Sequence, residues 1–145
     1  MTSFSYSTII EAPIETVFDY VSNIDNRMEW QESLVKVERL TPLPDGVGAH
    51  WKETFQYGKK ASTADMRYAA FERPHIFTED ITTNNATGVI DVKFAEAGNY
   101  TELSVFVTMK WRGRFRLLAP LANSVFKKAI TKDFGDINTK LKSRT

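Results

Sequence analysis

Glu53 is the residue whose surroundings point most directly to chemistry. In residues 49–57, Trp51, Phe55 and Tyr57 recur with Glu53 at every second position, the period that puts side chains on one face of a strand. A carboxylate facing inward among these rings would have its pKa raised by desolvation unless it is paired. Because a carboxyl group with a raised pKa can act as a general acid or base, Glu53 is the candidate catalytic residue.

A purely structural role for Glu53 is the alternative, and we favour it. Arg67, Lys52 or a tyrosine hydroxyl could hold the carboxylate at the edge of a cavity, or a bulge could turn it to solvent. Tyr57 and Tyr68 could hydrogen-bond a ligand carbonyl, although buried tyrosines commonly bond within their own protein.

The residue types that hold metals and phosphates are scarce. The chain has no Cys and two His, and neither His50 nor His75 begins a metal-ligand spacing. The Gly46-Val47-Gly48 turn lacks the third glycine and the following helix of a phosphate-binding loop. We therefore expect no metal and no cofactor, and the lack of Cys favours a reducing compartment.

Alternation and helical spacing predict the elements that position these residues. Residues 4–11 form the first strand, a short amphipathic helix begins at Pro13, and residues 24–30 form a second short helix. Short turns then separate six further strands, which predicts an antiparallel meander. These strand candidates are residues 34–40, 49–57, 62–72, 76–83, 88–96 and 101–111.

A long C-terminal helix is predicted from Pro120 to about Ser143, where apolar residues recur by threes and fours. Leu118, Leu121 and Val125 point nearly half a turn away from the apolar stripe of the later turns, which suits a different contact. Gly135 lies inside this helix, and the pattern offers no reason for it.

Alternation and helical spacing predict which side chains of the sheet and the helix point inward, and for any single one of them we favour filling of a core over contact with a ligand. Ten Phe, five Tyr and three Trp call for a large interior. The residues predicted to face inward are Trp51, Phe55, Tyr57, Met66, Tyr68, Ile90, Val92, Phe94, Val105, Val107, Phe126, Ile130 and Phe134.

Charge is unevenly distributed along the chain. The net charge is +1, yet residues 110–145 carry 10 basic and 2 acidic residues. Lys110, Arg112, Arg114 and Arg116 interleave with apolar side chains and could meet an anionic membrane or an acidic partner. A solvated helix lead-in is the simpler reading, and overall neutrality with no recognition motif argues against nucleic acid.

The same order of elements resembles the START-like, or polyketide cyclase/dehydrase, superfamily. The resemblance rests on IIEAPIETVFDYVSNIDNRMEW (residues 9–30), the Gly-Val-Gly turn, FERP (residues 71–74) and GNYTELSVFV (residues 98–107). It implies an α+β helix-grip fold, with a curved antiparallel sheet of about seven strands, two short helices after strand 1 and a long C-terminal helix over the sheet. It also implies a tunnel for lipids, sterols or polyketides, so the inward-facing residues given above are the predicted ligand-binding residues.

This resemblance limits the functions to be considered but does not select one of them, because one fold hosts several activities. We expect one domain over residues 1–145 and, with neither export signal nor membrane span visible, a cytoplasmic location. The leading hypothesis is binding or transport of a small hydrophobic ligand without catalysis. The alternatives are a polyketide cyclase or dehydratase using Glu53, and a module that binds a membrane surface or a protein. The oligomeric state stays open.

Overall fold

The computed structural model describes residues 2–144, apart from the side chain of Tyr57, so the predicted ligand contact of Tyr57 lies outside the described residues. One antiparallel sheet holds seven strands in the order β1-β7-β6-β5-β4-β3-β2. The strands are β1 (Thr2–Ile10), β2 (Leu34–Arg39), β3 (His50–Tyr57), β4 (Lys60–Glu72), β5 (Ile76–Thr82), β6 (Ala86–Ala97) and β7 (Tyr100–Trp111).

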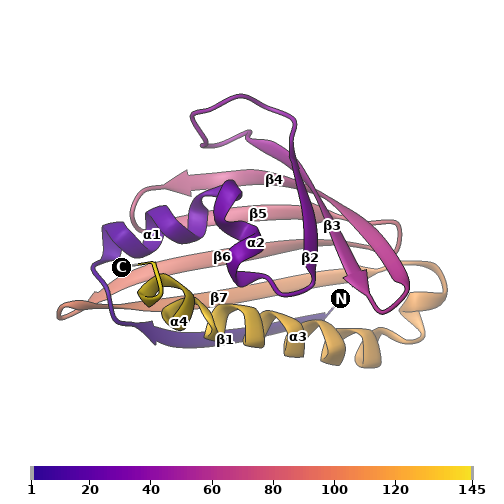
Figure 1. Ribbon diagram of the computed structural model, residues 1–145. Helices are drawn as coiled ribbons and strands as arrows, with labels where there is room; N and C mark the ends of the chain where they lie inside the picture. Colours follow the sequence, from indigo (N-terminus) through magenta and orange to yellow (C-terminus); the bar gives the residue numbers. More distant parts are fainter. Residues whose placement is uncertain (1, 145) are drawn as a thin grey trace.

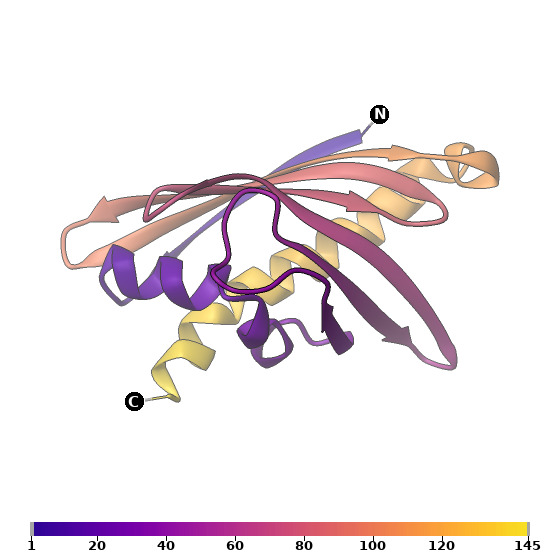
Figure 2. The same ribbon diagram turned by 90° about the horizontal axis from the view of Figure 1, so that it is seen from above.

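The helices gather on one face of this sheet (Figures 1 and 2). Between β1 and β2 lie α1 (Ile14–Ser22), the 3-10 turn η1 (Ile24–Asn26) and α2 (Arg27–Trp30). After β7 follow the 3-10 turn η2 (Gly113–Arg116), α3 (Ala119–Gly135) and α4 (Ile137–Lys142). Figure 2 shows α3 running diagonally beneath the sheet, whose β2–β4 side curls toward the helices. The predicted helix-grip fold is confirmed, with strand ends shifted by one or two residues.

Strict alternation of side chains builds the inner face of the sheet. In β7, Leu103, Val105 and Val107 are buried, whereas Glu102 and Phe106, on the other face, are exposed. The sheet therefore offers one apolar face to the helices and one mixed face to solvent, as an antiparallel sheet with a single covered face requires.

The predicted long C-terminal helix is present, but it is interrupted once, at Asp136. The Asp136 N–H still donates to the Lys132 carbonyl at 3.0 Å, so the chain keeps its direction into α4. Gly135 lies at the end of α3, where a Cβ atom would be 3.1 Å from the Tyr6 hydroxyl of β1. The absence of a side chain at Gly135 thus leaves room for the Tyr6 hydroxyl against α3.

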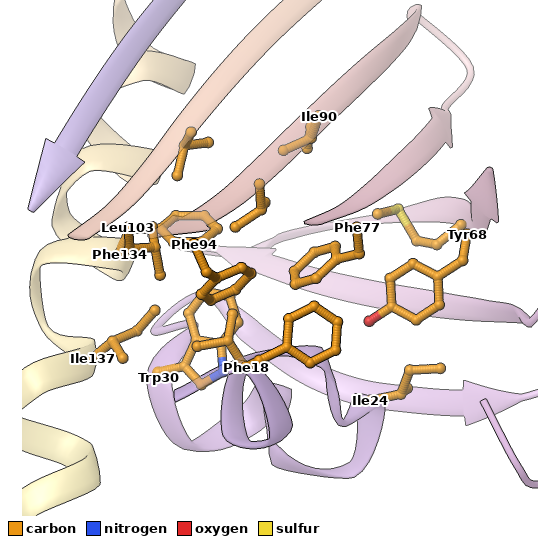
Figure 3. Close-up of a cluster of buried hydrophobic side chains, with 14 of the residues drawn as sticks. Phe18, Ile24, Trp30, Tyr68, Phe77, Ile90, Phe94, Leu103, Phe134 and Ile137 are labelled. Atoms are coloured by element: carbon orange, nitrogen blue, oxygen red, sulfur yellow. The ribbon is translucent and has the colours of Figure 1, made fainter. Parts of the chain in front are cut away.

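Aromatic rings hold the helices against the sheet (Figure 3). Phe18 of α1 meets Phe71, Phe77 and Phe94 at centroid distances of 5.3, 6.0 and 5.1 Å, and all three contacts are edge-to-face. Trp30 of α2 lies 4.9 Å from Phe134 of α3. Such pairs add about 0.5–1.5 kcal/mol each beyond the area that they bury. The packed core therefore lies where α1, α2 and the end of α3 meet the sheet.

Gly88 in β6 is a test of how tightly the sheet packs. A Cβ atom there would lie 2.8 Å from the Thr108 carbonyl and would collide with the Met109 sulfur. We expect Gly88→Ala to lower the free energy of unfolding by about 1–3 kcal/mol, the usual cost of overpacking. Urea titration measures this loss. Gly46→Ala, where the new methyl meets open space, is the matched control, and equal losses in the two variants would contradict the account.

Candidate functional site

Arg27 is the one buried cation within residues 2–144, and it organises the polar interior. It is the first residue of α2 and is 1% exposed. One guanidinium nitrogen donates to the Glu79 carboxylate and, at 2.9 Å, to the Tyr68 hydroxyl. The other terminal nitrogen lies 3.7 Å from Glu53 Oε2. One guanidinium thus faces two carboxylates, from β3 and β5.

Aromatic rings enclose this guanidinium. Its central carbon lies 5.3 Å from the Trp51 ring centroid and 5.6 Å from that of Trp30, with Tyr68 and Phe77 within 6.0 Å. Burial by itself would lower the pKa of Arg27, but electrostatic interactions with Glu79, Tyr68 and Glu53 outweigh this effect and raise it. Arg27 therefore stays charged, and cation–π attraction adds to its ion pairs.

Glu53 is buried and faces inward, as its place in the alternation predicts. Desolvation raises the pKa of its carboxyl to about 7, although Arg27 acts in the opposite direction, and Glu79 raises it further. Its Oε2 accepts a hydrogen bond of 2.8 Å from the Trp51 indole N–H. Its partners are thus Arg27 and Trp51, rather than the exposed Arg67 and Lys52 proposed as holders from the sequence.

The Tyr68 hydroxyl is fully engaged within the protein. It donates to the Ser22 carbonyl at 2.5 Å and accepts from Arg27. Burial raises the pKa of this phenol above its ordinary value. Tyr68 therefore serves the junction between α1, α2 and the sheet.

A pocket of about 530 Å³ lies between α3 and the curved sheet. This volume is within the range of roughly 300–1,000 Å³ typical of small-molecule sites. Its wall is mainly apolar. Its residues are Gln31, Glu53, Phe55, Ala61, Ser62, Thr63, Ala64, Met66, Glu79, Ile81, Thr83, Asn84, Asn85, Ala86, Ile90, Met109, Trp111, Phe126, Ala129, Ile130, Asp133 and Phe134.

Three carboxylates share this pocket wall: Glu53, Glu79 and Asp133. Desolvation raises the pKa of Asp133 to about 6, while the Glu32 backbone N–H, 3.3 Å from its Oδ1, acts in the opposite direction. Glu53 and Asp133 therefore both change protonation close to neutral pH. The wall can accept hydrogen bonds when they are ionised and donate them when they are protonated.

The predicted ligand-binding residues separate into two groups. Those on the pocket wall, together with Glu53, are Phe55, Met66, Ile90, Phe126, Ile130 and Phe134. Those buried in the packed core away from the wall are Trp51, Tyr68, Val92, Phe94, Val105 and Val107. The first group comes from α3 and from strands of the sheet, and the second includes residues packed around α1 and Arg27.

Sequence reasoning missed Arg27, Glu79 and Asp133. Glu79 had a signal, because it alternates with the apolar Phe77 and Ile81 in β5. Arg27 lies in a four-residue helix that has no period to read. Its only signal was the need for a cation near an inward-facing Glu53.

Within residues 2–144, no group of three or more His, Cys, Asp and Glu side chains is arranged to hold a metal ion. Over the same residues, no helix has both the length and the apolar character needed to cross a bilayer.

Arg27→Met tests whether the buried cation holds the interior together. This change keeps an apolar side chain but leaves Glu79 and Glu53 without their cation, so we expect a loss of about 3–5 kcal/mol in unfolding free energy at neutral pH. Chemical denaturation followed by tryptophan fluorescence measures it.

Arg73→Met is the matched control, because Arg73 pairs with Asp19 at 2.7 Å while both side chains are about half exposed. Solvent screens that pair, so this variant should stay close to the unsubstituted protein. An Arg27→Met variant as stable as the Arg73→Met variant would contradict the role given to Arg27.

Comparison with known proteins places this geometry in a wider group. Among curated proteins, none matches the chain. Of the solved structures, the ZhuI aromatase/cyclase of a Streptomyces strain superposes with a TM-score of 0.86 at 11% identity, over 99% of this chain and 94% of that one. The TTHA0849 protein of Thermus thermophilus superposes with a TM-score of 0.85 at 10% identity over 99% of both chains.

The protein Ara h 8.0201 shares the fold as well, with a TM-score of 0.77 and 17% identity over 98% of both chains. At these identities the likeness shows the fold alone. The sequence itself matches one family over residues 1–145, the full length of the helix-grip fold described above. The chain therefore belongs to the polyketide cyclase/dehydrase and lipid transport family.

Proposed function

We propose that the protein binds a small hydrophobic molecule in the pocket between α3 and the sheet. The observation that carries this proposal is a pocket of about 530 Å³ whose wall is mainly apolar and includes buried carboxylates. An apolar body would contact Phe55, Ile90 and Phe126, while a polar end would meet Glu53 or Asp133. Pockets of this composition orient a ligand through a few polar groups.

The polar end of the ligand should carry hydrogen-bond donors. Glu53, Glu79 and Asp133 are acceptors when ionised, and Arg27, the nearby cation, is not part of the pocket wall. Hydroxyl groups therefore fit this end better than a carboxylate, which the ionised side chains would repel. We retain a cytoplasmic location as part of the proposal, since the chain has no Cys.

A second candidate function is cyclisation of a linear β-polyketone, with Glu53 as acid and base. The raised pKa of Glu53, about 7, favours it. The Glu53 carboxylate would take an α-proton, the resulting enolate carbon would attack a carbonyl carbon of the same chain, and the protonated carboxyl would return the proton to the alkoxide. Tyr68 gives this role less support, because its hydroxyl already bonds Ser22 and Arg27.

Filling the pocket tests the binding proposal. Ala129 lines the wall from α3, so Ala129→Phe should weaken binding of 2-naphthol at least tenfold, a change of about 1.4 kcal/mol. Isothermal titration calorimetry measures the affinity, and Ala95→Phe on the exposed face of β6 is the control. The proposal fails if the unsubstituted protein binds no 2-naphthol, or if both variants bind it equally well.

Glu53→Gln separates the two candidate functions. If the protein only binds and transports its ligand, the variant should keep 2-naphthol binding. Neither the variant nor the unsubstituted protein should then cyclise a linear β-polyketone thioester. Cyclisation by the unsubstituted protein and its loss in Glu53→Gln, with binding retained, would instead favour the enzyme. Native mass spectrometry and solvent extraction of the purified protein would identify a molecule already held.

A further inference from the structure

An exposed apolar surface lies where η2 passes into α3. Leu117 is 88% exposed, Leu118 50%, Leu121 64% and Val125 62%. The last three recur at the helical spacing that puts side chains on one face, and none of them lines the pocket. Four large aliphatic side chains within nine residues form a patch of the kind that marks an interaction site.

Positive charge surrounds this apolar patch. Lys110, Arg112, Arg114 and Arg116 precede it, and Lys128 follows Val125 by one helical turn. No Asp or Glu occurs between positions 110 and 132. Within residues 2–144, none of these five cations forms an ion pair. Their charge is therefore available to an anionic partner.

The chemistry of the patch distinguishes between anionic partners. Its exposed apolar groups are aliphatic, whereas the nearby aromatic residues, Trp111 and Phe115, are partly buried. A surface for single-stranded nucleic acid would need exposed rings on which bases stack. Hydrocarbon chains instead accept aliphatic side chains in any orientation, and anionic headgroups attract the flanking cations.

We propose that the surface formed by residues 110–128 docks on an anionic membrane, with Leu117, Leu118, Leu121 and Val125 entering the lipid. The same segment borders the pocket. Trp111 and Phe126 line the pocket wall, and the Arg112 N–H donates to the carbonyl of the wall residue Asn85 at 2.7 Å. In Figure 1 this end of α3 lies far from the C-terminus, so α4 stays clear of the docked surface.

Vesicle sedimentation tests this proposal. The unsubstituted protein should sediment with vesicles of phosphatidylcholine mixed with anionic phosphatidylglycerol, and not with vesicles of phosphatidylcholine alone. Binding should weaken as salt shortens the Debye length. Combining Arg112→Gln, Arg114→Gln and Arg116→Gln should reduce the partition coefficient about a hundredfold, since each cation near the surface contributes about 1 kcal/mol.

A matched control carries the same loss of charge elsewhere. Lys36→Gln, Lys52→Gln and Lys140→Gln together neutralise three exposed lysines of β2, β3 and α4 and should leave vesicle binding unchanged within about twofold.

A second variant with Leu118→Ser, Leu121→Ser and Val125→Ser should lose binding while keeping its charge. All these positions are exposed, so the fold should survive.

Three results would overturn the proposal. The first is no sedimentation with anionic vesicles at low salt. The second is equal binding by the arginine variant and the lysine control. The third is self-association in the absence of vesicles that the Leu118, Leu121 and Val125 substitutions abolish, because the patch would then be an interface between copies of the chain. None of these results bears on 2-naphthol binding in the pocket.

Discussion

The buried contact between one guanidinium and two carboxylates is the constraint on which the rest of the interior depends. Glu53 and Glu79 lie under the helices on separate strands, and Arg27 reaches both from α2. Burying a carboxylate without a partner costs several kcal/mol, so the short helix must sit where its arginine meets the sheet. The position of α2 then places Trp30 against Phe134, which anchors the end of α3. The contacts of Arg27 with Glu53 and Glu79 therefore both compensate the buried charges and fix the position of α2.

Arg27 neutralises the two carboxylates only in part, and this leaves Glu53 with a chemically useful property. One cation serves two carboxylates, and the Arg27–Glu53 distance of 3.7 Å is long for a direct hydrogen bond. Arg27 therefore offsets only part of the cost of burying the Glu53 carboxylate, and burial raises the pKa of this group. Glu53 also borders the pocket, so its proton faces the space in which we propose that the ligand binds.

Periodicity predicted most of the fold, and it also predicted the inward face of β3 that carries Glu53. It could not separate pocket from core, because alternation gives the face of a strand and not what covers it. Ile90 and Phe94 share a face of β6, yet Ile90 borders the pocket whereas Phe94 packs 5.1 Å from Phe18 of α1. Arg27 escaped prediction for a related reason, since its partners come from strands far along the chain. The sequence did predict that Leu118, Leu121 and Val125 point away from the apolar stripe of the later turns, because a helical projection needs only local spacing.

The most direct measurement is the titration of the Glu53 carboxyl group, followed by NMR of the side-chain carboxyl carbon and assigned by comparison with Glu53→Gln. Burial with partial compensation by Arg27 predicts a pKa of about 7. An ordinary pKa close to 4.5 would mean that Glu53 is solvated or fully paired, and it would contradict the arrangement of the interior described above.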